Sequence, residues 1–292
     1  MKIKPLMTLI FMLLSISIVI AQQASTEKIS IAGQVSDKST HQLLAYVSVG
    51  VLNKPQGTVS DSLGKFSFSI SNEYYSDTLQ ISMVGYYPVR ISVRDFMNAS
   101  NKNIQLAENI SQLSDVIVQS GPSKTNTEII GKQSTGKFTQ VSIHNKSGVE
   151  ETIGSEMGMR YKIEKPDALL KNFNFYISAN NFNSIKFRIN IYSVKNDLPD
   201  SLICNKQIIT NLDNFKTGWT KVDLESFTIK VKEDIIVTVQ WVESRMDKKE
   251  IPVTIVPVTI TLFAKNCYVR VASQDKWKRM GMKVSSFITI AY

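Results

Sequence analysis

Cysteine and histidine are scarce in this chain of 292 residues, which has two of each. The histidines, His41 and His144, are widely separated, so no Cys/His cluster with the ligand spacing of a zinc site is expected. A Cys–His or Ser–His–Asp arrangement would need side chains from distant parts of the chain to meet. We therefore predict no catalytic residue, no cofactor-binding residue and no metal ligand.

The two cysteines, Cys204 and Cys267, leave two alternatives open. In an exported protein they could form a disulfide. Alternatively both are free thiols, because Cys267 alternates with Val269 and Val271 on what reads as a buried strand face.

Long apolar runs are also lacking, with one exception at the N-terminus. Lys2 and Lys4 precede an apolar run from Leu6 to Ile20, and Ala21 ends it, which is typical of a cleaved secretory signal over residues 1–21. An uncleaved anchor helix is the alternative, although the run is short for a membrane span. We expect an exported protein of the periplasm, the outer-membrane surface or the extracellular space, with at most peripheral membrane association.

The net charge of +9 falls mainly after Gln119. This excess is compatible with anionic envelope partners such as lipopolysaccharide, acidic glycans or wall polymer. Scattered solvated lysines on strand faces are the simpler explanation. A nucleic-acid partner is not expected, because the export signal directs the chain elsewhere and no binding motif is present.

The most informative stretch runs from Gly57 to Tyr86. Thr58–Ser60 and Lys65–Ile70 are predicted strands, and Phe66, Phe68 and Ile70 alternate with polar residues. Asp61 and Gly64 between them are turn residues, so we predict a four-residue hairpin connection. About seven such short strands between residues 30 and 119 predict a small β-sandwich.

Several pieces of this region together resemble a known family. The pieces are Ile31-x-Gly33-x-Val35-x-Asp37, Leu44-x-Tyr46-Val47, Gly57-Thr58-x-x-Asp61-x-x-Gly64-x-Phe66 and Leu79-x-x-Ser82-x-x-Gly85-Tyr86. Over residues 29–118 they look like the carboxypeptidase-regulatory-like domain of exported Bacteroidetes proteins. The resemblance implies a prealbumin-like, seven-stranded sandwich without catalytic residues.

The resemblance has two further implications. The domain often precedes TonB-dependent receptors, but a receptor plug and barrel would need several hundred further residues, so transport is not carried over. The triplets beginning at Asp61 and Asp77 also look like O-glycosylation sites of such proteins, which would place sugars on Ser62 and Thr78. The alternative is that both are turn residues at strand ends.

After a polar stretch at residues 119–137, which we interpret as a linker, the signal is all strand. Ile185, Phe187, Ile189 and Ile191 alternate strictly with polar residues, which predicts one buried and one solvated face. About ten strands and no convincing amphipathic helix predict a second, jelly-roll-like β-sandwich over residues 138–292. The whole chain is thus predicted to be all-β.

These features favour a non-enzymatic cell-envelope protein that binds an envelope protein or a glycan. The alternatives are a hydrolase acting on envelope polymers and a small outer-membrane β-barrel. Trp277 among Lys276, Lys278 and Arg279 could stack on a sugar or bind an anion, or it could fold onto the core edge. A shared cleft of Trp277, Trp241 and Arg245 would favour the binding role.

Overall fold

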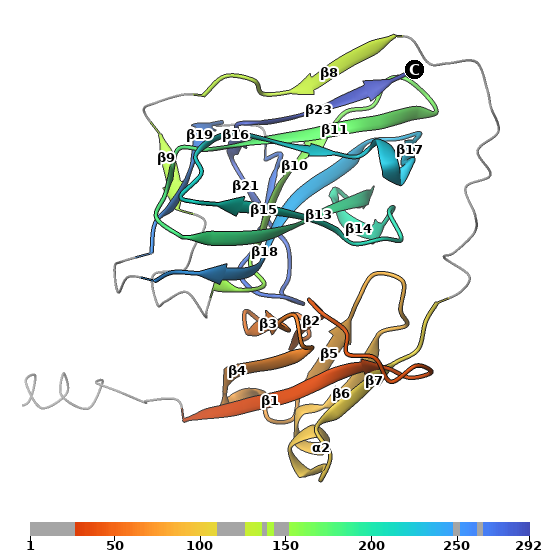
Figure 1. Ribbon diagram of the computed structural model, residues 1–292, viewed down its shortest axis with the longest axis vertical. Helices are drawn as coiled ribbons and strands as arrows, with labels where there is room; N and C mark the ends of the chain where they lie inside the picture. Colours follow the sequence, from red (N-terminus) through yellow and green to blue (C-terminus); the bar gives the residue numbers. More distant parts are fainter. Residues whose placement is uncertain (1–26, 110–125, 136–138, 143–151, 248–251, 262–264) are drawn as a thin grey trace, which may run out of the picture.

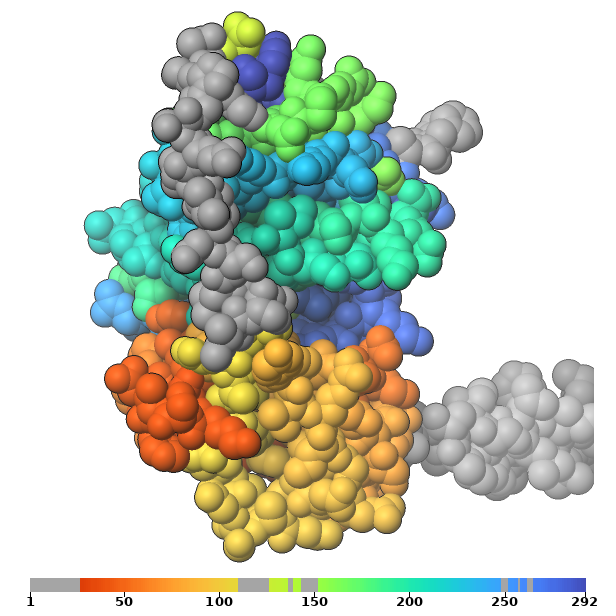
Figure 2. Space-filling view, turned by 90° about the vertical axis from the view of Figure 1, so that its right-hand side faces the viewer, coloured from red at the N-terminus to blue at the C-terminus, as the bar shows by residue number. Residues whose placement is uncertain are grey.

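The computed structural model describes residues 27–109, 126–135, 139–142, 152–247, 252–261 and 265–292 (Figure 1). Within these residues the chain is almost entirely β-structure and forms two domains, which pack together as two lobes (Figure 2). The all-β prediction is confirmed. The proposed signal, residues 1–21, and the end of the predicted first sandwich, residues 110–119, lie outside the described residues.

The N-terminal domain is a sandwich of seven strands in two sheets. The strands are β1 (Lys28–Asp37), β2 (Ser48–Val51), β3 (Gly57–Val59), β4 (Lys65–Ser71), β5 (Thr78–Ser82), β6 (Val89–Ser92) and β7 (Asn103–Leu106). One sheet has the order β4-β1-β7 and the other β3-β2-β5-β6, and only β1 and β7 run parallel. Apolar side chains from the inner faces of both sheets form one core between them.

Local patterns explain this core. In β4, Phe66 and Ile70 are buried while Lys65, Ser67 and Ser69 are exposed, as the alternation predicts. A short helix that the sequence did not reveal, α2 (Val93–Asn98), begins where Ser92 Oγ accepts a hydrogen bond of 3.0 Å from the backbone N–H of Asp95.

The predicted hairpin around Asp61 is wrong, although its turn chemistry is right. Asp61 Oδ1 accepts bonds of 2.8 Å from the N–H groups of Leu63 and Lys65, and Gly64 has φ 71°. However, β3 pairs with β2 and β4 pairs with β1, so the turn carries the chain from one sheet to the other. Ser62 is exposed in this turn, and Thr78 is half-buried at the start of β5.

The C-terminal domain holds sixteen strands among the described residues. They are β8 (Thr127–Gly131), β9 (Gln140–Ser142), β10 (Glu156–Tyr161), β11 (Ala168–Ile177), β12 (Ala179–Asn180), β13 (Ser184–Lys195), β14 (Leu198–Leu202), β15 (Ile208–Asp213), β16 (Gly218–Asp223), β17 (Lys230–Val231), β18 (Ile235–Arg245), β19 (Thr254–Ile260), β20 (Cys267–Arg270), β21 (Lys278–Met280), β22 (Met282–Val284) and β23 (Ser286–Ala291).

These strands form three sheets. Two are large and enclose the core, and the third is smaller. The first large sheet has the order β14-β13-β18-β10-β20-β21, with β15 also on β13. The second has the order β16-β11-β23-β8, with β17 on β11, and the small sheet joins β12, β19 and β22, with β9 on β19. The inward side chains of β13 and β18, among them Phe187 and Trp241, are buried between the sheets.

Residues 127–131, which the sequence analysis assigned to the linker, form β8 instead. This strand pairs with β23 at the edge of the second sheet, and Ile130 packs against the core. The strand is short and its flanks are polar, so composition alone suggested a linker. In Figure 1, β8 lies at the end of the C-terminal domain remote from the N-terminal domain.

The predicted solvated face of the first large sheet is not solvated. Arg188 and Asn190 of β13 are each 4% exposed, and Thr238 and Gln240 of β18 are fully buried. The N-terminal domain packs against part of this outer face through Tyr46 and Ser48. Residues after β20, among them Trp277, pack over another part of it.

Candidate functional site

A buried polar cluster lies on the outer face of the first large sheet, centred on Glu156. Glu156 is 3% exposed, and its carboxylate accepts hydrogen bonds from Arg270 Nε at 2.8 Å, Asn190 Nδ2 at 2.8 Å and Tyr192 OH at 3.1 Å. Arg270 Nη2 and Thr238 Oγ1 also donate to it. Burial raises the pKa of Glu156, but the charge of Arg270 and these bonds outweigh it, so the net pKa is lowered.

Arg188 links this cluster to the N-terminal domain. Its Nη1 donates to the carbonyl oxygen of Tyr46 at 2.7 Å, and its Nη2 donates to Ser48 Oγ at 2.7 Å. Its Nε donates to Gln240 Oε1 at 3.1 Å. Burial lowers the pKa of Arg188, while the nearby charge of Glu156 opposes this effect. The positive charge is thus held by neutral oxygens of both domains.

Further polar contacts fix the two domains together. Lys186 Nζ lies 2.6 Å from Glu243 Oε1 and donates to Tyr46 OH at 2.8 Å. Gln274 bonds the side chains of Gln80 at 2.6 Å and Ser82 at 2.7 Å. These contacts join side chains of the two domains directly.

The cluster is suited to docking and not to acid–base chemistry. A general base needs a pKa near the working pH, whereas Arg270 keeps the pKa of Glu156 low. The donors around it are also engaged: Arg188 donates to Ser48 across the domain boundary and to Gln240, and Asn190 donates to Gln240 within the C-terminal domain.

Trp277, Trp241 and Arg245 do not share a cleft. The ring of Trp277 lies over the Arg270 guanidinium at 4.7 Å and meets Tyr192 edge-on at 5.7 Å, so it packs on the outer face of the sheet. Trp241 is 2% exposed and lies on the inner face, against Phe187. Arg245 lies 3.7 Å from Asp247.

The remaining candidate residues are also separated. His41 bonds Gln105 at 3.2 Å in the N-terminal domain, and His144 lies outside the described residues. Cys204 and Cys267 are both free thiols. Burial raises the pKa of both, that of Cys267 to about 12. The described residues contain no group of three or more His, Cys, Asp or Glu able to hold a metal ion.

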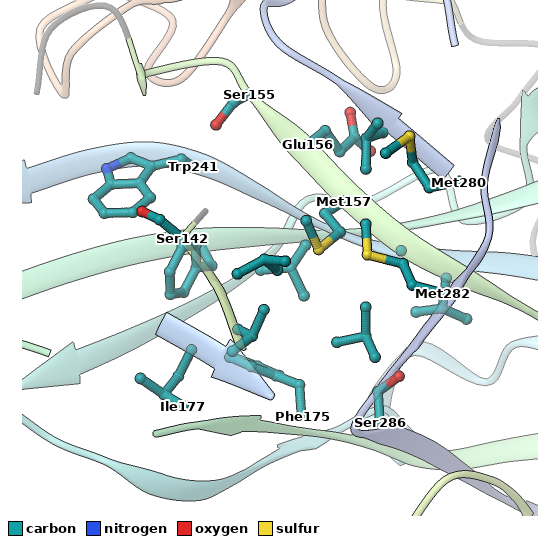
Figure 3. Close-up of a pocket in the computed structure, with 18 of the residues that line it drawn as sticks. Ser142, Ser155, Glu156, Met157, Phe175, Ile177, Trp241, Met280, Met282 and Ser286 are labelled. Carbon is teal, nitrogen blue, oxygen red and sulfur yellow. The ribbon is translucent and has the colours of Figure 1, made fainter. Parts of the chain in front are cut away.

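An apolar cavity of about 470 Å³ lies between the sheets of the C-terminal domain (Figure 3). Aromatic side chains of β11, β13 and β18 line it, together with three methionines, Met157, Met280 and Met282. Its polar lining is sparse, and Pro55 of the N-terminal domain also reaches its wall. The buried Trp241 Nε1 has no hydrogen-bond partner within the described residues.

The sequence pattern does not reveal this cavity. Its lining residues alternate inward along several strands, a pattern that is the same for a packed core and for a hollow one. The one available signal was the three methionines at its wall, Met282 buried, Met157 half-buried and Met280 42% exposed, because flexible methionine side chains are common at adaptable binding surfaces.

Comparison with known proteins identifies the N-terminal domain. Residues 31–118 match the family of the CarboxypepD_reg-like domain, which confirms the resemblance seen in the sequence. No curated protein matches the chain. Within the described residues, no helix is long and apolar enough to cross a membrane.

Solved structures resemble the chain only distantly. One contains the cysteine protease and lectin-like domains of a surface-layer-associated protein of Clostridium difficile, with 10% identity, a TM-score of 0.40, and coverage of 89% of this chain and 62% of that chain. A putative membrane-associated protein of unknown function from Bacteroides fragilis has 13% identity, a TM-score of 0.21, and coverage of 90% and 97%. The chain therefore spans less than two thirds of the first of these structures.

Proposed function

We propose that this chain is a non-enzymatic exported protein of the cell envelope that binds an apolar ligand inside its C-terminal β-sandwich. The observation that carries the proposal is the cavity of about 470 Å³. Binding pockets for small molecules measure about 300–1,000 Å³ and are lined mainly by apolar and aromatic side chains.

The composition of the wall supports an apolar ligand. Protein interiors are normally close-packed, and an unfilled cavity lowers stability because its lining atoms lack partners. The wall combines flat aromatic side chains such as Phe175 and Trp241 with the flexible side chains of Met157, Met280 and Met282. Such a wall can adapt to an elongated hydrocarbon.

Two polar groups at the wall already have hydrogen-bond partners, which favours binding of a ligand over its hydrolysis. The Glu156 carboxylate is held by Arg270, and Ser286 Oγ shares a hydrogen bond of 2.7 Å with Tyr161 OH. These groups are engaged in the structure and are not free to attack a substrate. The export part of the proposal rests on Lys2, Lys4 and the apolar run at residues 6–20.

The test is a titration of the purified, delipidated chain with N-phenyl-1-naphthylamine, a neutral apolar dye. We expect saturable binding with enhanced dye fluorescence. The variant Val239→Trp fills the cavity and should weaken binding at least tenfold, because Val239 lines its wall. The control Ile129→Trp adds the same ring at a half-exposed position of the edge strand β8 and should bind as wild type. Absence of saturable binding, or equal binding by Val239→Trp, refutes the proposal.

A further inference from the structure

A second hollow, of about 490 Å³, lies beside the apolar cavity and shares Val284 and Ser286 with it. Its wall comes from residues 131–134, which follow β8, from the end of β10, and from residues 283–286. The hydrogen-bonded pair of Tyr161 and Ser286 belongs to this wall. In contrast to the cavity, this hollow is lined largely by polar groups.

The ammonium group of Lys132 is the unusual feature of this hollow. The Lys132 side chain as a whole is half-buried, but its Nζ atom is shielded from solvent and has no hydrogen-bond partner within the described residues. Burial lowers the pKa of Lys132, and the positive charge of Lys283 lowers it further. A buried ammonium without a partner is costly, so such a group is normally paired with an anion.

Arg160, the third cation at the wall, is already neutralised. Arg160 donates to Asp197 Oδ1 at 2.8 Å and to Asp234 Oδ2 at 2.9 Å. Lys132 itself is held in place, because its backbone N–H donates to the carbonyl oxygen of Ser286 at 2.8 Å. Among the described residues that line this hollow, Lys132 and Lys283 are therefore the two cations available to an anion.

We propose that the ligand is an anionic amphiphile whose apolar tail fills the cavity and whose carboxylate or phosphate head binds Lys132 and Lys283 in the adjoining hollow. This inference rests on the proposed function, which supplies the site for the tail. Lysine binds such oxyanions as a compact charge with three N–H donors. The head group would supply the missing partner of Lys132.

The experiment displaces N-phenyl-1-naphthylamine from the delipidated chain with four competitors: dodecanoate, dodecyl phosphate, dodecanol and inorganic phosphate. We expect the two anionic chains to bind about tenfold or more tightly than dodecanol, the difference expected for a charge-assisted hydrogen bond. In Lys132→Met this preference should disappear while affinity for the neutral dye stays unchanged. Lys283→Met should reduce the preference in part and serves as a second, more exposed test position.

Lys162→Met is the matched control, because Lys162 is exposed on the strand end beside the hollow and pairs with Glu164 at 2.8 Å. It should keep the full preference. Equal binding of dodecanoate and dodecanol, or an unchanged preference in Lys132→Met, overturns the inference but leaves the proposed function standing. Tight binding of inorganic phosphate without a preference for the anionic chains also overturns it. Failure of the dye and of every chain to bind refutes the proposed function as well.

Discussion

Replacement of Arg188 by alanine should strongly destabilise the protein, although Arg188 contacts no carboxylate. The guanidinium is 4% exposed and donates to Tyr46, Ser48 and Gln240. Without it, acceptors on both sides of the domain boundary lose their donor in a site that water cannot readily enter. Each buried polar group left without a partner costs about 1–3 kcal/mol.

We therefore expect Arg188→Ala to lower the free energy of unfolding by about 3–5 kcal/mol, the range for breaking a buried charged network. The matched control is Arg160→Ala, which removes two ion pairs, with Asp197 and Asp234, from a side chain that is 30% exposed. Pairs of this kind are each worth about 0–1 kcal/mol. A prediction from the number of ion pairs alone would make Arg160→Ala the more destabilising of the two variants.

Urea unfolding monitored by tryptophan fluorescence measures both variants, because all three tryptophans, Trp219, Trp241 and Trp277, lie in the C-terminal domain. With a slope of about 2 kcal/mol per M, Arg188→Ala should shift the midpoint down by roughly 2 M. The urea midpoint of Arg188→Lys should lie between those of Arg188→Ala and Arg160→Ala, because lysine keeps the charge of arginine but not its planar guanidinium group. A shift smaller for Arg188→Ala than for Arg160→Ala would refute this reasoning.

Gly50→Ala should separate the domains, detected as faster limited proteolysis between them, because an added Cβ would lie 2.1 Å from a carbonyl oxygen of the C-terminal domain. At pH 8 Cys267 should resist thiol reagents, since burial raises its pKa to about 12, and Cys204 should react slowly. In urea both cysteines should react, giving two thiols per chain. A count of fewer than two thiols would mean that a disulfide is present. Glu156→Gln should destabilise the chain by about 3–5 kcal/mol at pH 7 by leaving Arg270 unpaired. Because the folded-state pKa of Glu156 is lowered from 4.5, its stabilisation is present above that value and is lost as the pH falls, so wild type and variant should converge in acid.

Much of the fold could be predicted from the sequence. The alternation of Phe66 and Ile70 with exposed polar residues correctly gave a half-buried strand. The turn residues Asp61 and Gly64 correctly gave a turn. These features are local, because they depend on the two faces of a strand and on backbone conformation over a few residues.

The partners of those local features could not be predicted. Alternation assigns Arg188 and Asn190 to one face of a strand, but it does not say whether water or another domain covers that face. A signal was present in the residue types, since Asn190, Thr238 and Gln240 are short or uncharged where an exposed strand would commonly carry lysine or glutamate. The cavity was invisible for a similar reason, because the pattern records which side chains point inward and not how completely they fill the space.

The position of β8 affects how the two domains stay together. The chain leaves the N-terminal domain after β7 and re-enters the described structure next to β8, at the remote edge of the C-terminal domain (Figure 1). Sixteen residues, 110–125, join the two domains and can span at most roughly 55 Å, so the two domains of one chain are held at a high local concentration relative to each other. When two copies meet at comparable concentration, the N-terminal lobe of one can occupy the docking face of the other through the same Arg188 contacts. Reciprocal exchange would then yield a swapped dimer that needs no new interface.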